Sequence, residues 1–314
     1  MNLLLCGSFE RVEREQWRAA LAAAMPEHHV VVDAGEVDPA SVEVAIVANP
    51  PEGSLRGLPS LRLIQSLWAG VDRLLADRTL PPEVPIARMV DPALAAAMAE
   101  TALWAALSLH RGFFAYQQRQ RQACWRVHAQ RRADEVGITV LGLGAMGLAC
   151  AQVLLRQGYR VAGWTRSEAG ARSVPGLAQL AGRDALARQL PLIDIVLNLL
   201  PLTPDTRGLL NAQLFRALPP HASIVNFGRG GHLIEADLLA ALDSGHLRHA
   251  VLDVFESEPL PADHRFWHHP KVTVLPHTAA LTDPRSAAQR VAANVQSLIE
   301  GREIAFRVDR ARGY

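Results

Sequence analysis

Three polar residues in the second half of the chain are of the types that carbonyl reduction needs. Arg229, Glu258 and His277 each follow an apolar run that predicts a β-strand. Ligands of open parallel sheets bind beyond the carboxyl ends of the strands, so we expect these side chains at one edge. A histidine can donate a proton, a carboxylate can favour its charged form, and an arginine can hold a substrate's negative charge. This set predicts acid–base chemistry on a carbonyl compound that carries an anionic group.

A glycine-rich turn indicates a dinucleotide site. Gly142, Gly144 and Gly147 directly follow the predicted strand 138–141 and precede an apolar helical pattern. The first glycine permits a tight turn, the second lets the backbone approach a pyrophosphate, and the third lets helix and strand pack closely. The helix N-terminus offers free N–H groups to the phosphates.

The tip of the next predicted strand indicates which cofactor is bound. An NAD site normally has Asp or Glu there, to accept a hydrogen bond from the ribose 2′-hydroxyl. This sequence has Trp164, Thr165, Arg166 and Ser167, and the nearest carboxylate, Glu168, lies beyond the turn. A guanidinium pairs strongly with a 2′-phosphate. We therefore expect NADPH, with NADH possible but weaker.

These motifs resemble the D-isomer-specific 2-hydroxyacid dehydrogenase family nearly from end to end. The resemblance rests on the segment 66–72, the glycine turn, the segment 200–206, and Arg229, Glu258 and His277 in that order. The segments 164–167 and 308–314 are similar to the bacterial glyoxylate/hydroxypyruvate reductase A branch.

The resemblance implies NADPH-dependent reduction of small 2-keto acids such as glyoxylate and hydroxypyruvate. His277 would give a proton to the keto oxygen, Glu258 would hold the imidazole, and Arg229 would bind the substrate's carboxylate and carbonyl. Backbone N–H groups of three earlier residues would hold the same carboxylate: Trp68, Ala69 and Gly70.

The cofactor-binding set that follows from the glycine turn and the resemblance includes Asp253, which would hold the nicotinamide amide. No metal is expected. The set is Gly142, Gly144, Ala145, Met146, Gly147, Trp164, Thr165, Arg166, Ser167, Leu200, Pro201, Thr206, Phe227, Gly228, Asp253, His277 and Ala279.

Other functions remain open. The same fold could act as a nucleotide-sensing corepressor module, and the acid-free run 101–133, which carries six arginines, motivates that alternative. A reductase of bulkier 2-keto acids is a further possibility, because no pocket-forming signature in the sequence separates glyoxylate from hydroxypyruvate or a bulkier 2-keto acid. Formate or phosphite oxidation would need polar substrate residues that the sequence does not reveal.

The elements that position these residues alternate between strand and helix, which predicts an α/β fold with two doubly wound parallel sheets. We expect a flavodoxin-like substrate domain over 1–104 and 284–314, and a Rossmann dinucleotide-binding domain over 105–283, with a cleft between them. One long helix is predicted over 94–120 and a last helix over 284–299.

Composition excludes several other classes. The 314 residues include 32 basic and 31 acidic side chains, and Lys271 is the only lysine. A P-loop is therefore excluded, and a nucleic-acid binder is disfavoured by the near-zero net charge. Three dispersed cysteines favour a reducing cytoplasm, and no membrane span is expected. The resemblance suggests a homodimer built through the second domain, with Trp125 on a projecting arm.

Overall fold

The computed structural model describes residues 1–167 and 174–314. The chain forms two compact units: unit 1 is Met1–Leu94 with Thr282–Tyr314, and unit 2 is Ala95–Leu281. The sequence placed these boundaries after residues 104 and 283. The first boundary falls inside one continuous helix, so neither a turn nor a change of composition marks it in the sequence.

Unit 1 contains a five-stranded parallel sheet in the order β2-β1-β3-β4-β5. This is the flavodoxin-like order, and it confirms the predicted fold class. The strands are β1 Asn2–Gly7, β2 His29–Val31, β3 Val42–Ala48, β4 Leu63–Ser66 and β5 Ile86–Ala87. The helices are α1 Arg11–Ala24, α2 Asp72–Ala76 and α9 Pro284–Ile299, with short 3-10 helices η1 Ala34–Glu36 and η2 Pro39–Ser41.

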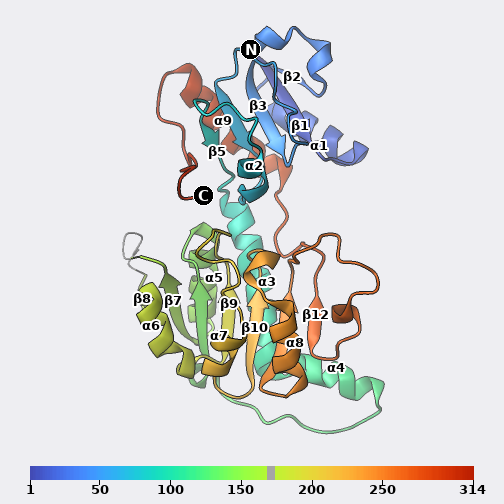
Figure 1. Cartoon of the computed structure of the whole chain (residues 1–314), viewed down its shortest axis with the longest axis vertical. Helices are drawn as coiled ribbons and strands as arrows, with labels where there is room; N and C mark the ends of the chain where they lie inside the picture. The colour runs from blue at the N-terminus through green and yellow to red at the C-terminus, as the bar shows by residue number, and fades with distance from the viewer. Residues whose placement is uncertain (168–173) are drawn as a thin grey trace. The chain divides into compact units, whose positions relative to one another are not determined.

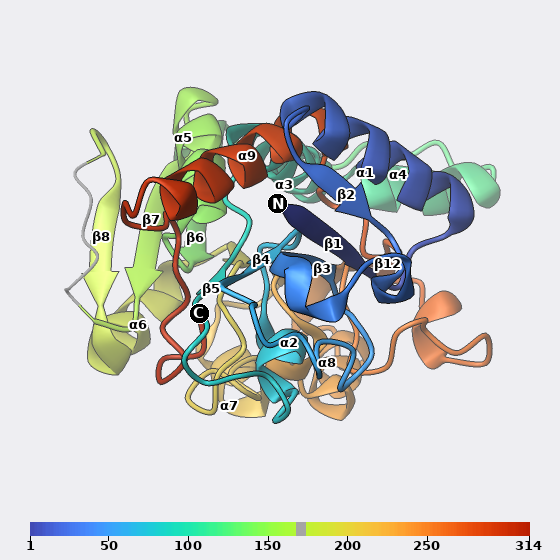
Figure 2. The ribbon, with the colours of Figure 1, turned by 90° about the horizontal axis from the view of Figure 1, so that it is seen from above.

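The last helix of the chain completes unit 1. Helices α1 and α9 lie side by side (Figure 2). Asp283 caps α9 by accepting a hydrogen bond from the Arg285 N–H, and Pro284 fits the first turn because its missing N–H would have no partner there. Asn294 in α9 donates to the buried Gln65 of β4 at 2.7 Å. These contacts explain why the chain returns to its first unit after the second is finished.

Unit 2 contains a seven-stranded parallel sheet in the order β12-β11-β10-β9-β6-β7-β8, with the doubly wound arrangement predicted (Figure 1). The strands are β6 Gly137–Leu141, β7 Arg160–Thr165, β8 Ala178–Ala181, β9 Ile195–Asn198, β10 Ala222–Asn226, β11 Leu247–Leu252 and β12 Val272–Val274. The helices are α3 Pro92–Arg111, α4 Phe113–Arg121, α5 Ala145–Arg156, α6 Gly182–Gln189, α7 Ala212–Ala217 and α8 Glu235–Asp243. Short 3-10 helices are η3 Ala133–Glu135, η4 Leu190–Leu192, η5 Gly230–His232 and η6 Arg265–Trp267.

Two apolar clusters cover the two faces of this sheet. Successive side chains of a strand point to opposite faces, so Ile224 packs with α7 and α8 whereas Val225 packs with α3 and α5. The inner strands β6, β9 and β10 are buried on both faces, as is usual in parallel sheets, whereas the edge strands β8 and β12 are only partly buried. This packing holds the carboxyl ends of the strands rigidly along one edge.

The predicted single helix over 94–120 is wrong. Helix α3 ends at Arg111, and Gly112 adopts a left-handed conformation (φ 75°) before α4 begins. A Cβ at Gly112 would lie 2.7 Å from the His128 ring, so the bend depends on the absence of a side chain.

Within the described residues, α3 is the one helix whose length and composition would allow a membrane span. Half of its apolar window is buried, and Met98, Ala102 and Leu109 belong to the core of unit 2. Its apolar character is therefore that of a core helix.

Candidate active site

The structure brings Glu258 and His277 together beyond the carboxyl ends of β11 and β12. His277 Nδ1 lies 2.9 Å from Glu258 Oε2, and Glu258 Oε1 accepts a hydrogen bond from the Phe255 N–H at 2.9 Å. Both carboxylate oxygens are thus used, one to fix the Glu258 side chain and one to fix the imidazole. The histidine is half exposed, with its Nε2 edge turned away from the pair. This is a geometry in which the imidazole can exchange a proton with a bound molecule.

A left-handed backbone conformation presents this histidine. His277 has φ 52°, which residues other than glycine adopt at a conformational cost. Asp253 holds the loop, because its carbonyl accepts from the His277 N–H at 2.9 Å. Its Oδ1 accepts from the N–H groups of Thr278 and Ala279 at 2.7 and 3.0 Å. Burial raises the pKa of Asp253, with the Thr278 and Ala279 hydrogen bonds acting in the opposite direction.

Arg229 follows β10 on a loop that packs against the Glu258 loop. Its Nη1 donates to the Gly228 carbonyl at 2.7 Å. A Cβ at Gly230 would lie 1.9 Å from the Phe255 carbonyl carbon, so only glycine allows the two loops to approach this closely. Glycine at position 230 therefore sets the distance between the backbone of Arg229 and the loop that carries Glu258.

The glycine turn has the form that a dinucleotide site requires. Gly142 is left-handed (φ 97°), and a Cβ at Gly147 would lie 1.8 Å from the Gly142 carbonyl oxygen. A Cβ at Gly144, in contrast, would meet nothing within 4 Å. That open space lies at the N-terminus of α5, which has no side-chain cap and whose first N–H groups, including those of Ala145 and Met146, lack partners inside the helix. The turn fits the pyrophosphate of a dinucleotide.

Arg166 lies just after β7, and its Nη1 is 2.7 Å from Asp205 Oδ2. Thr165 donates through Oγ1 to the Ser167 carbonyl at 2.9 Å, which closes the turn that carries Arg166. Glu168, the nearest carboxylate to this turn, and Arg172, a second arginine in the same segment, lie outside the described residues.

Several predicted cofactor residues have side chains that serve the core. Trp164 is buried and donates through Nε1 to the Gly182 carbonyl at 2.8 Å, so its indole faces away from the turn. Thr206 donates to the Pro201 carbonyl at 2.8 Å. Three more predicted residues have buried side chains, so they can line a site through their main chain: Leu200, Phe227 and Ala279.

The segment 68–70 lies in unit 1, after β4. The Trp68 N–H donates to Ser66 Oγ at 3.0 Å, and the Trp68 carbonyl accepts from the Met89 N–H at 3.0 Å. Within the described residues, no hydrogen bond engages the N–H of Ala69 or Gly70. Those two amides therefore remain candidates for anion binding, whereas the Trp68 N–H already has a partner.

A buried polar cluster beneath Arg229 is absent from the predicted set. It consists of Asn198, Asn226 and His232, all fully buried and hydrogen-bonded to one another or to the Arg229 loop. Two asparagines at the ends of adjacent predicted strands are a signal that could have indicated it, because buried amides require partners.

The other histidines do not converge. His264 Nε2 lies 3.1 Å from Glu235 Oε2, and His269 Nε2 lies 3.1 Å from Asp243 Oδ1. In 1–167 and 174–314, no group of three or more metal-ligating side chains is found.

Comparison with known proteins is consistent with this geometry. The family model for the D-isomer specific 2-hydroxyacid dehydrogenase, NAD binding domain, matches residues 103–279. Glyoxylate/hydroxypyruvate reductase A of Serratia proteamaculans is 39% identical over 320 aligned positions that span the whole of both chains. The corresponding reductase of Yersinia enterocolitica is 37% identical, again over both whole chains.

Solved structures of the same family are also similar to this chain. A D-isomer specific 2-hydroxyacid dehydrogenase from Xanthobacter autotrophicus Py2, in complex with NADPH and MES, superposes with a TM-score of 0.93 at 38% identity, covering 100% of this chain and 99% of the other. An NADPH-dependent glyoxylate/hydroxypyruvate reductase from Sinorhizobium meliloti, in complex with NADP and sulfate, gives 0.91 at 34% identity, with the same coverage. The chain therefore belongs to the D-isomer specific 2-hydroxyacid dehydrogenase family.

Proposed function

We propose that this chain is an NADPH-dependent reductase of small 2-keto acids, with glyoxylate and hydroxypyruvate as preferred substrates. The observation that carries the proposal is the pairing of His277 with Glu258 at 2.9 Å, on the sheet edge that also carries Arg229. The names of the relatives in Serratia and Sinorhizobium, and the NADP in the latter, support the substrate class and the cofactor.

Each residue of the site has its own role in the proposed reduction. When bound at the glycine turn, NADPH supplies a hydride to the keto carbon. His277 donates through Nε2 the proton that the keto oxygen takes up, and the product is a 2-hydroxy acid. Glu258 stabilises the imidazolium before that transfer and fixes its orientation through Nδ1. Arg229 holds the substrate's carboxylate by charge-assisted hydrogen bonds. Asp253 holds the loop that carries His277, and its Oδ2 is the oxygen we assign to the nicotinamide amide.

A direct assay tests this function. The purified protein is mixed with NADPH and glyoxylate or hydroxypyruvate, and the loss of absorbance of the reduced nicotinamide is followed. We expect turnover with both substrates and slower turnover with NADH. Absence of turnover with any 2-keto acid would contradict the proposal.

A bulkier 2-keto acid as substrate is the alternative. A difference of one methylene changes selectivity by only ~1–3 kcal/mol, so the residues named here do not by themselves separate the candidates. Steady-state comparison of glyoxylate, hydroxypyruvate and phenylpyruvate decides between them. A higher kcat/KM for phenylpyruvate than for glyoxylate and hydroxypyruvate would indicate that the preferred substrates are bulkier 2-keto acids.

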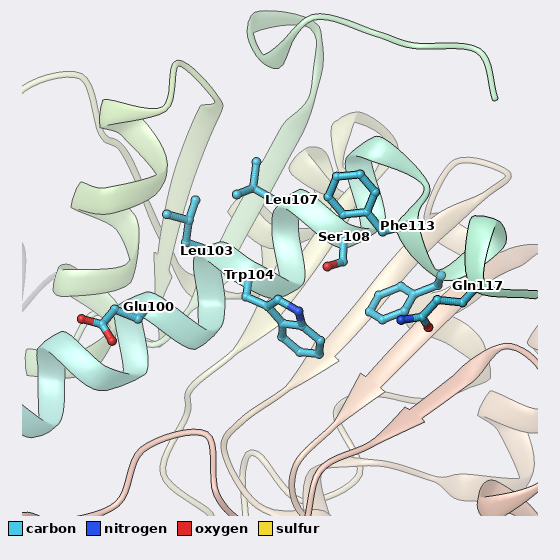
Figure 3. A pocket seen from close by; sticks show the side chains of 8 residues that line it. Glu100, Leu103, Trp104, Leu107, Ser108, Phe113 and Gln117 are labelled. Carbon is cyan, nitrogen blue, oxygen red and sulfur yellow. The ribbon is translucent and has the colours of Figure 1, made fainter. Parts of the chain in front are cut away.

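We also propose that the protein is a homodimer formed through α3, α4 and the arm 122–132. An apolar groove of about 450 Å³ lies along α3 and α4, where Trp104 and Phe113 are 40% and 50% exposed (Figure 3). On the arm, Trp125 and Val127 are 99% and 78% exposed. Large apolar side chains exposed on a helix pair and on the arm that follows it are typical of a protein interface.

Light scattering tests the dimer. We expect a dimer for the native chain and a monomer for the double variant Trp125→Ser with Val127→Ser. Leu192→Ser, at an exposed apolar position on η4 of the same unit, is the matched control and should remain dimeric. A monomeric native chain would contradict the proposal.

We place the enzyme in the cytoplasm. Cys6, Cys124 and Cys150 are all free thiols, which a reducing compartment preserves. Cell fractionation tests this, and recovery outside the cytoplasmic fraction would contradict it.

A further inference from the structure

One buried imidazole connects the two halves of the candidate site in unit 2. His232 lies at the end of η5 and is completely buried. Its Nδ1 is 3.1 Å from the Arg229 backbone nitrogen and 3.0 Å from Asn198 Nδ2. Its Nε2 is 3.2 Å from the carbonyl oxygen of Pro201, in the segment assigned to the cofactor.

The surrounding hydrogen bonds determine which nitrogen carries the proton. The Arg229 N–H and Asn198 Nδ2 are donors, so Nδ1 must accept. The Arg229 carbonyl is also 3.1 Å from Nδ1, but it already accepts from Asn226 Nδ2 at 3.0 Å and from the His232 N–H at 3.2 Å. The Pro201 oxygen can only accept, so Nε2 carries the hydrogen. A neutral imidazole with its proton on Nε2 satisfies both ends.

The two asparagines of the cluster complete this arrangement. Asn198 Nδ2 also donates to Asn226 Oδ1 at 2.8 Å, and Asn198 Oδ1 accepts from the Leu200 N–H at 3.3 Å. Asn226 Oδ1 also accepts from the Gly228 N–H at 3.2 Å. The main chain on both sides of Arg229 and the main chain before Pro201 are thus tied to one buried network. Losing a partner would leave a buried polar group unsatisfied, which is strongly unfavourable.

We propose that His232 is a positioning residue that couples the cofactor segment at Pro201 to the substrate-binding Arg229 through opposite ends of one neutral imidazole. The inference rests on the proposed roles of Pro201 and Arg229. It assigns a function to a fully buried residue outside the predicted site set.

Two conservative variants test separately the hydrogen bonds that Nδ1 and Nε2 of His232 make. An asparagine can place its amide oxygen near the position of Nδ1, and a glutamine can place its amide nitrogen near Nε2. His232→Asn therefore keeps an acceptor for the Arg229 N–H and loses the donor to Pro201. His232→Gln keeps the donor to Pro201 and loses the acceptor for Arg229.

The readouts are the dissociation constant of NADPH, measured by fluorescence titration without substrate, and kcat and KM for the keto acid. We expect His232→Asn to weaken NADPH binding by about fivefold or more, with a smaller change in the KM of the keto acid. We expect His232→Gln to raise that KM and lower kcat/KM by about tenfold or more, with NADPH binding close to the native value.

His264→Asn and His264→Gln are matched controls. His264 also accepts a backbone N–H through Nδ1, from Phe266, and contacts Glu235 through Nε2, but it lies outside the site. Both controls should keep native kinetics, and melting temperatures show whether each variant folds.

Parallel losses of both properties in both His232 variants would overturn the coupling role and indicate a purely structural one, as would native values in both. Absence of keto-acid turnover by the native protein would instead contradict the proposed function. In that case the NADPH titration still tests the proposed link between His232 and Pro201. An unchanged affinity of His232→Asn for NADPH overturns the inference, and a weakened affinity supports it.

Discussion

The guanidinium of Arg166 and the carboxylate of Asp205 form an ion pair at the end of β7, with Nη1 2.7 Å from Oδ2. Arg166 is the residue we assign to the 2′-phosphate of NADPH. Asp205 belongs to the loop after β9, close in sequence to Pro201. A bound 2′-phosphate must therefore compete with the Asp205 carboxylate for the Arg166 guanidinium. Asp205, which is not in the predicted set, is thus expected to influence the preference for NADPH over NADH.

Removing the charge of Asp205 should strengthen NADPH binding. In Asp205→Asn the guanidinium no longer pairs with a carboxylate, and a negative charge near the phosphate is lost. Exposed ion pairs contribute ~0.2–1 kcal/mol, so we expect the dissociation constant of NADPH to fall by about 1.4- to fivefold. Fluorescence titration measures it. Asp134→Asn, which breaks the exposed pair with Arg132, is the control and should change nothing. Weaker NADPH binding in Asp205→Asn would show that Asp205 assists the site.

Reversing the charge at Arg166 should change the cofactor preference. In Arg166→Asp a carboxylate would repel the 2′-phosphate and could accept a hydrogen bond from the ribose 2′-hydroxyl of NADH. We expect kcat/KM for NADPH to fall by about tenfold or more and that for NADH to rise. Steady-state kinetics with both cofactors measure the ratio. An unchanged preference would place the phosphate contact elsewhere, with Arg172 the next candidate.

Much of the fold follows from patterns that are local in the sequence. The apolar runs of β6 and β10 and the glycine turn after β6 carry their own signals, because burial on both faces and a positive φ each demand particular residue types. The strand-end positions of Arg229, Glu258 and His277 were also predictable, because each residue follows an apolar run that forms a strand of one parallel sheet.

The features that the sequence did not reveal depend on contacts between segments that are distant in the chain. Gly112 breaks the helix through its left-handed backbone, and the ring of His128, sixteen residues later, lies where a side chain at position 112 would be; the long apolar pattern of α3 conceals this break. The alternation of β7 likewise turns the indole of Trp164 into the core, so the predicted cofactor contact of this residue stays a prediction that its main chain would have to fulfil. His232 and Asp205 matter through hydrogen bonds and an ion pair with partners on other loops, which one sequence cannot reveal.

Neutralising Glu258 should slow the chemical step. In Glu258→Gln the amide oxygen can still accept from the Phe255 N–H, but the imidazolium of His277 loses its negative partner. We expect kcat for keto-acid reduction to fall by about 10²-fold or more, with NADPH binding unchanged. Glu256→Gln, two residues earlier, is the control, because Glu256 is exposed and pairs with Arg207. Native kcat in Glu258→Gln would remove Glu258 from the mechanism.

His249 makes the stability of unit 2 dependent on pH. Its ring stacks on Phe114 with centroids 4.4 Å apart, and its Nε2 lies 2.9 Å from Thr273 Oγ1. Burial lowers the pKa of His249 from 6.5 to about 4, with His269 adding to the shift. The folded state thus holds the neutral ring while the unfolded chain takes up a proton below pH 6.5. The stabilisation is complete above that pH and is lost as pH falls to about 4, by at most roughly 3 kcal/mol.

His249→Gln should remove that dependence. Glutamine keeps a polar group for Thr273 but does not titrate, so we expect lower stability at pH 7, through the lost stacking on Phe114, and a smaller decline between pH 6.5 and 4. Urea unfolding at pH 7, 5.5 and 4.5 measures both quantities. The exposed His268→Gln is the control and should keep the native slope. If His249→Gln loses stability with acid as steeply as the native protein, other groups carry the dependence, and the neutral state of His249 is not what couples α4 to the sheet.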